Sequence, residues 1–135
     1  MSDEFEFYTP APRFDKEAAA DGVWHTVDDE NGEVYVEVKM LLMDNDNPRW
    51  TARRDRWKRA NREGKDKEAY FRKMVAHVAV VDWKLKDPKG KPVEYTGEKA
   101  DYYFSKLSFA YESCLTFATD VKNFVEADLG NSSTT

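Results

Sequence analysis

The chain has 135 residues, 41% hydrophobic and 35% charged, with 21 basic and 26 acidic side chains for a net charge of −5. This length suits a single domain with a hydrophobic core. One cysteine, Cys114, excludes a disulfide scaffold, and no apolar run is longer than that at 78–81, which is too short to span a membrane. The acidic start, Met1–Phe5, does not resemble a signal peptide, so we expect a soluble intracellular protein.

The first part of the chain predicts an arm followed by a β-hairpin. Residues 1–22 contain two prolines and no sustained hydrophobic period, so we predict an extended acidic arm. Residues 23–27 and 34–42 are rich in valine, and the second run alternates side chains as half-buried strands do. Between them, Asn31-Gly32 predicts a tight reversal with positive φ angles.

Two helices are predicted next. Asn47 is a strong N-cap residue and Pro48 suits the first helical position, so a basic helix is expected from Pro48 to about Asn61. Asp66 predicts the N-cap of a second helix, which is apolar on most sides and continues to about Trp83.

The remaining chain predicts a turn and more helix. Residues 87–90 place Asp, Pro and Gly where a type I turn favours them. After a cap at Thr96, apolar residues recur every three to four positions, as one long helix or as two shorter helices broken near Ser108. Gly130 is expected to end this segment.

Together these elements predict an α+β fold, with an N-terminal β-hairpin packed on a bundle of three to four helices. The expected organisation is an extended acidic arm over residues 1–22, a single α+β domain over residues 23–130 and a polar tail over residues 131–135.

Charge is distributed unevenly along the chain. Residues 1–48 carry 13 acids and three bases, a net charge of −10, whereas residues 49–73 carry 11 bases and four acids, a net charge of +7. This asymmetry indicates a surface for a charged partner, or pairing between the acidic and basic segments of the same chain.

No motif predicts catalysis, a cofactor or a metal site. His25 and His77 are not at metal-ligand spacing with each other or with Cys114. His77 is expected to be a hydrogen-bonded core residue and Cys114 a small buried side chain. The glycine patterns of phosphate-binding loops and of nucleophile elbows do not occur. We therefore expect a protein that is not an enzyme, with no catalytic, cofactor-binding or metal-binding residues.

The basic helix over residues 48–62 combines two tryptophans with many arginines. Trp50 and Trp57 are seven residues apart and share one face, close to Arg53 and Arg54. Such a helix could bind a protein groove or nucleic-acid phosphates, although the net negative charge disfavours nucleic acid. Alternatively, the tryptophans pack onto the domain while the arginines pair with the acidic segment.

Several motifs then follow one another in a recognisable order. Asn47-Pro48-Arg49-Trp50 opens the basic helix, and Val80-Val81-Asp82-Trp83 ends the apolar one. The stretch 87–96 contains Gly-Lys-Pro-Val before an aromatic residue and a helix cap, and 117–124 closes the last helix. This order, over about residues 34–127, resembles the tail assembly chaperones of long-tailed, lambda-like bacteriophages.

The resemblance implies a non-catalytic protein of the infected host cytoplasm that binds and solubilises the tape measure protein during tail assembly. It also implies transfer of that protein to the tail tube, absence from the mature virion, self-association, and a longer form made by ribosomal frameshifting. No membrane partner is implied.

Aromatic residues in the last helical segment outnumber what one helix face can bury. Phe104, Leu107 and Phe124 are expected in the core. The residues predicted to bind a client or a sister subunit are Trp50, Arg53, Arg54, Trp57, Tyr102, Tyr103 and Phe109. Two alternatives stay open: a small nucleic-acid-binding accessory protein that uses helix 48–62, and a phage tail or connector structural subunit.

Overall fold

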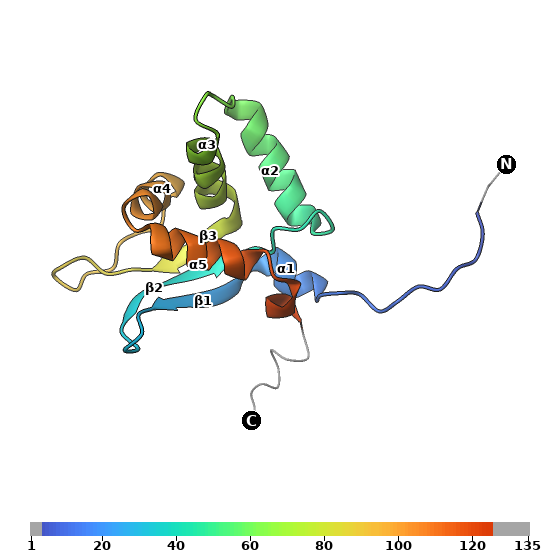
Figure 1. Cartoon of the computed structure of the whole chain (residues 1–135), viewed down its shortest axis with the longest axis horizontal. Coiled ribbons are helices and arrows are strands. Elements are labelled where there is room, and N and C mark those ends of the chain that lie inside the picture. Colours follow the sequence, from blue (N-terminus) through green and yellow to red (C-terminus); the bar gives the residue numbers. More distant parts are fainter. Residues whose placement is uncertain (1–3, 126–135) are drawn as a thin grey trace.

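The structure is a computed structural model and describes residues 4–125, so the predicted stop at Gly130 and the tail 131–135 lie outside the described residues. Figure 1 shows the arrangement of the chain. Its elements are α1 (Lys16–Asp21), β1 (Val23–Asp28), β2 (Val34–Met40), α2 (Pro48–Ala60), α3 (Lys67–Met74), η1 (Val75–Ala79), β3 (Val80–Lys84), α4 (Gly97–Lys106), α5 (Ser108–Ala118) and η2 (Val121–Phe124). Here η1 is a π-helix and η2 a 3-10 helix.

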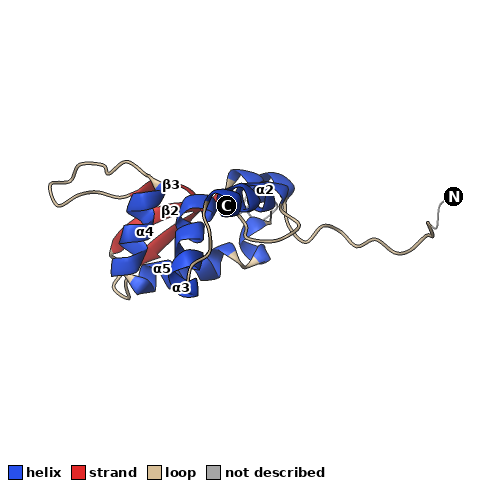
Figure 2. Cartoon of the chain, turned by 90° about the horizontal axis from the view of Figure 1, so that it is seen from above, coloured by secondary structure: helices blue, strands red, loops and turns tan. Residues whose placement is uncertain are grey.

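The strands form one antiparallel sheet in the order β1-β2-β3, with α5 packed against β1 and β2 (Figure 2). In β2, Val36, Val38 and Met40 are buried, while Glu37 and Lys39 between them are partly exposed. This period of two places one face of the sheet on the core. The predicted hairpin and the α+β fold class are confirmed.

The hairpin turn differs from the predicted Asn-Gly reversal. Gly32 has a φ of 85°, but Asn31 does not adopt a positive φ angle. The Gly32 N–H donates to the Asp29 carbonyl (3.0 Å), and the Asp29 N–H donates to the Glu33 carbonyl (2.9 Å). The Asp29 carboxylate also accepts from the backbone of Asn31 and Glu33, which stabilises a longer loop with one left-handed glycine.

The prediction of a helix that continues to Trp83 is wrong. The α-helix ends at Met74, η1 follows, and the chain then enters β3, where Trp83 lies opposite Val38. An uninterrupted apolar run such as 78–81 suits a buried strand as well as a buried helix. Pairing with β2 satisfies the backbone of this run and turns the hairpin into a three-stranded sheet.

The extended arm is shorter than predicted. Residues 16–21 form α1, which Asp15 caps by accepting from the Glu17 N–H (2.9 Å). Phe14 and Ala19 are buried in a small cluster with Phe124, and the Asp15 N–H donates to the Phe124 carbonyl (2.7 Å). The arm therefore ends where residues 14–15 attach to the domain.

Asn47 is at the N-cap of α2, as predicted, but its side chain does not cap the helix. The residue is 1% exposed, and its Nδ2 donates to the carbonyls of Ala19 and Leu42, both at 2.8 Å. Asn47 thus joins α1, the end of β2 and the start of α2 at one buried point.

The chain after β3 follows one of the two predicted alternatives. The turn at residues 87–90 is formed, with the Gly90 N–H donating to the Asp87 carbonyl (2.9 Å). Thr96 caps α4 by accepting from the Lys99 N–H (3.0 Å). Two helices follow, broken at Leu107. Within residues 4–125, no helix is both long and apolar enough to cross a membrane.

Candidate functional site

Two residues of the predicted partner-binding set, Trp50 and Arg53, have structural contacts within the domain. Trp50 is 4% exposed and packs in the main core, so its prediction as a surface contact is corrected. Arg53 is half-buried, and its Nε and Nη2 donate to the carbonyls of Val78 and His77, both at 3.1 Å. Burial lowers the pKa of Arg53, and the nearby Arg49 lowers it further. Arg53 therefore holds α2 against η1.

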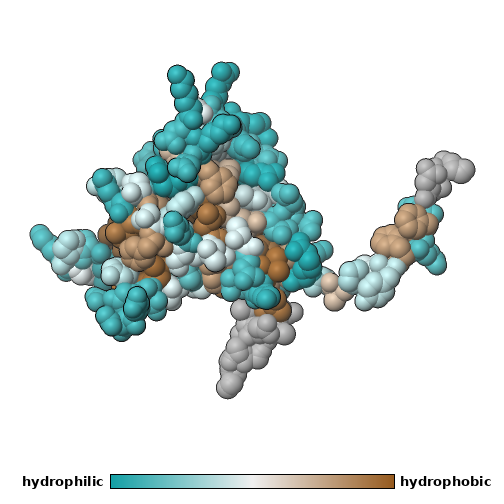
Figure 3. Space-filling view, in the orientation of Figure 1, coloured by the Kyte–Doolittle hydropathy of each residue, from teal (hydrophilic) through white to brown (hydrophobic). Residues whose placement is uncertain are grey.

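The other bases of this region form a separate charged surface. In Figure 1, α2 and α3 rise from the domain as a helical hairpin, and in Figure 3 hydrophilic side chains gather over its outer end. Within residues 4–125 its exposed bases make no ion pair. We call these bases the basic tip: Arg56, Lys58, Arg59, Arg62, Lys65, Lys67 and Lys73.

Aromatic rings form the base of a groove between the two helices of the tip. The groove has a volume of about 480 Å³, and Arg62, Lys65 and Lys73 line it. The rings of Trp57 and Tyr70 have their centroids 5.1 Å apart. The Tyr70 hydroxyl donates to the Asn61 carbonyl (2.8 Å), and Asn61 Nδ2 donates to the Trp57 carbonyl (2.9 Å). These bonds hold the tip groove in shape.

Two acids of the acidic segment pair within that segment. Asp44 and Asp46 both form ion pairs with Arg13. Arg54 pairs instead with Asp55 (3.0 Å) and also donates to Asn45 (3.0 Å). Asp44, Asp46 and Arg54 therefore do not show the predicted pairing of the acidic segment with the basic helix.

A second surface is aromatic and lies over α4 and α5. Tyr102 is 65% and Phe109 45% exposed, whereas Tyr103 is half-buried with its ring edge-on to Trp83 at 5.8 Å. Phe104 and Phe124 are buried, as predicted, and Leu107 is partly buried. We define the aromatic face as the following exposed and half-buried residues: Tyr35, Phe71, Tyr102, Tyr103, Phe109 and Tyr111.

Ring contacts join some members of the aromatic face to one another or to the core. Tyr35 and Phe109 make an edge contact at 5.2 Å, and Tyr111 contacts the buried Phe104 at 5.4 Å. A depression of about 540 Å³ between α3, α4 and α5 is lined by Phe71 and Tyr111. A second depression, of about 650 Å³, is lined by Tyr35 and Trp83. Figure 3 shows hydrophobic surface in this region. Charged side chains also line both hollows, so they suit an amphipathic partner helix whose apolar stripe meets the rings.

The titratable residues that could carry chemistry have structural roles. His25 Nε2 is 2.8 Å from Ser113 Oγ, the ring stacks on Phe117 at 4.4 Å, and burial lowers the His25 pKa. Cys114 is buried, as predicted, and burial raises the pKa of its thiol to about 12. Within residues 4–125, no three His, Cys, Asp or Glu side chains cluster closely enough to hold a metal ion.

His77 departs from the predicted core position. It is half-exposed at the edge of η1, with Nδ1 donating to the Lys73 carbonyl at 2.9 Å. Its ring lies 6.0 Å from that of Trp57 and directly against Gly97.

Sequence reasoning missed the tip groove and half of the aromatic face. Tyr70 approaches Trp57 across 13 residues, a separation that no helical or strand period indicates. Phe71 lies in the predicted apolar helix, where a core position is the simpler interpretation, and Tyr35 lies in the predicted second strand of the hairpin. A signal was present for Tyr35, which alternates out of phase with the core valines of its strand.

Comparison of the chain with protein-family models, with curated proteins and with solved structures found no match.

Proposed function

We propose that this protein is a non-catalytic tail assembly chaperone of a long-tailed bacteriophage, and that its aromatic face binds the tape measure protein. The supporting observation is the set of exposed aromatic side chains that includes Tyr102 and Phe109, the latter in edge contact with Tyr35. A long helical client presents apolar stripes that aggregate in water, and shallow aromatic contacts can cover such stripes and release them again. The motif order described above supports the same class.

The proposal places the protein in the host cytoplasm, where it would deliver the client to the tail tube protein. A frameshifted longer form would carry the same aromatic face. The protein would be absent from purified phage particles, and its detection there by mass spectrometry would favour a structural subunit instead.

Co-expression with fragments of the tape measure protein from the same genome tests the proposal. The soluble fraction of a fragment should rise in the presence of the wild-type protein. Tyr102→Ser combined with Phe109→Ser should abolish the rise, because both rings are exposed and their loss removes apolar contact area without opening the core. Equal precipitation of the client with and without the wild-type protein would reject the function.

Trp24→Ser is the matched control for this experiment. Trp24 is an exposed aromatic residue on the face of the sheet away from α5, since the adjacent His25 faces α5, and this separates it from Tyr102 and Phe109, the two residues replaced. The Trp24→Ser protein should solubilise the client as the wild type does. If it loses the effect equally, the aromatic face is not the binding site.

A nucleic-acid-binding accessory protein is the second candidate. The observation that favours it is the basic tip, whose arginine and lysine side chains line the same groove as the rings of Trp57 and Tyr70. The nucleobases of single-stranded DNA or RNA could stack on these rings while arginines contact the phosphates. Binding of an oligonucleotide that falls steeply with salt would support this function, and no binding at low salt would exclude it.

A further inference from the structure

The end of the N-terminal arm alternates acidic and aromatic residues. It reads Glu4-Phe5-Glu6-Phe7-Tyr8, and the three aromatic side chains are 75%, 70% and 85% exposed. In an extended chain alternate side chains share a side, and the rings of Phe5 and Phe7 do lie 5.4 Å apart. Rings that stay this exposed are costly to leave in water, so this segment has the composition of a binding peptide.

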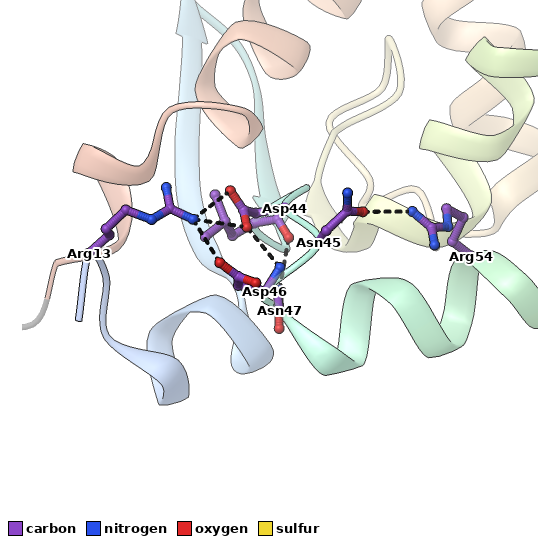
Figure 4. A network of polar contacts seen from close by, with 7 residues as sticks. Arg13, Asp44, Asn45, Asp46, Asn47 and Arg54 are labelled. Atoms are coloured by element: carbon purple, nitrogen blue, oxygen red, sulfur yellow. Dashed lines mark hydrogen bonds and ion pairs between the residues drawn. The ribbon is translucent and has the colours of Figure 1, made fainter. Parts of the chain in front are cut away.

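The arm is anchored at its base and points away from the domain. Figure 4 shows Arg13 Nη2 beside Asp44 (3.2 Å) and Asp46 (3.1 Å), and these hydrogen bonds raise the pKa of Arg13. Pro10 and Pro12 follow the aromatic segment, and proline keeps itself and the preceding residue extended. In Figures 1 and 2 the arm runs outward from the domain.

The basic tip has the complementary chemistry. Its groove offers the rings of Trp57 and Tyr70 to an aromatic side chain. Arg62, Lys65 and Lys73 line it together with one acid, Asp66, whose carboxylate caps α3. A strand with the Phe5 and Phe7 rings on one side and Glu6 on the other can place the rings in the groove and the Glu6 carboxylate beside the arginines and lysines. Arginine and lysine at an aromatic groove are also positioned for cation–π contact.

We propose that the arm of one copy, residues 4–8, binds the basic tip of a second copy. The contact is heterologous, so each molecule offers one arm and one tip, and association can continue beyond a dimer. A trans contact is favoured over a cis contact because the two prolines and the Arg13 anchor direct the arm away from its own α2. This inference does not rest on the proposed function.

Sedimentation velocity of the full chain over a range of concentrations tests the inference. The wild type should associate reversibly, and high salt should weaken association, because the contact joins opposite charges. Phe5→Ser/Phe7→Ser in the arm, or Arg62→Glu/Lys65→Glu in the tip, should each weaken association about tenfold or more, as expected for interface anchors. A mixture of the two variants should restore a dimer, because it retains one intact arm and one intact tip.

Matched controls and a cross-link separate the remaining outcomes. Lys89→Glu/Lys91→Glu alters the net charge by the same amount as the tip variant, but on the exposed turn after β3. It should leave association unchanged. Phe7→Cys on one chain and Arg62→Cys on another should form an intermolecular disulfide, since the native Cys114 is buried. A monomeric wild type, association that survives both pairs of variants, or a disulfide formed only within a doubly substituted chain would overturn the inference. So would a tip that binds a single-stranded oligonucleotide while the protein alone stays monomeric.

Discussion

Replacing Gly97 with alanine should destabilise the protein, and His77 should be the reason. Gly97 is the first residue of α4, and a Cβ there would meet His77 Cδ2 and lie 2.6 Å from Cγ and 2.7 Å from Nε2. Real Cβ atoms do not approach other atoms so closely, so the ring or the helix must move. The ring is held by its bond to the Lys73 carbonyl. Overpacking of this kind costs about 1–3 kcal/mol of unfolding free energy.

The same substitution should become harmless once the ring is removed. Gly97 does not have a positive φ angle, and alanine in a helix is otherwise favoured over glycine by roughly 0.5–1 kcal/mol. In a His77→Ala background, Gly97→Ala should therefore leave stability unchanged or raise it. Urea unfolding of the wild type, the two single variants and the double variant measures this coupling. An equal loss from Gly97→Ala in both backgrounds would refute the steric explanation.

Three further substitutions test other contacts. Asn47→Ala should cost about 1–3 kcal/mol of unfolding free energy. Asn47→Asp should cost more, because a carboxylate would face the two carbonyl oxygens that Nδ2 now contacts. In urea unfolding, the difference in unfolding free energy between the two variants should narrow at acidic pH, where the carboxylate is protonated. Arg53→Met should cost about 1–3 kcal/mol of unfolding free energy, because it removes both hydrogen bonds to the carbonyls of η1. Arg53→Lys should cost less, because lysine can still donate to one of the two carbonyls. Thermal and urea unfolding of the two variants measure the difference. Burial lowers the folded pKa of His25, so its contribution to stability is present above the unfolded pKa of about 6.5 and is lost as pH falls through the lower folded pKa. His25→Gln should remove this pH-dependent component from a plot of unfolding free energy against pH, and identical curves for the two proteins would contradict it.

Local chemistry predicted much of the fold. The alternating valines of β2, the Asp66 and Thr96 caps and the turn at residues 87–90 each depend on neighbours within a few residues, and the structure contains all of them. The strand at Val80 could not be predicted in this way, because its conformation depends on pairing with a strand 40 residues earlier. For the same reason α1 was missed, since its burial depends on Phe124.

The candidate surfaces were less predictable than the fold. Spacing correctly put Trp50 and Trp57 on one face of a helix, but it could not indicate that one would enter the core and the other would meet Tyr70. The exposure of Tyr102 and Phe109 was predictable, because the last helical segment has more aromatic residues than one helix face can bury. The separation of the arm from the basic tip is a tertiary property that net charge alone does not reveal.

The passage from α3 through η1 into β3 makes this part of the chain intolerant of changes in length. Arg72 at its start is fixed to Asp101 (2.8 Å), and Trp83 at its end donates through Nε1 to the Val93 carbonyl (2.9 Å). Deleting a single residue between them would slip the register of β3 by one position and turn Trp83 from the core to solvent. Homologous sequences should therefore conserve the number of residues here, and should vary in length instead around the exposed turn at residues 88–91.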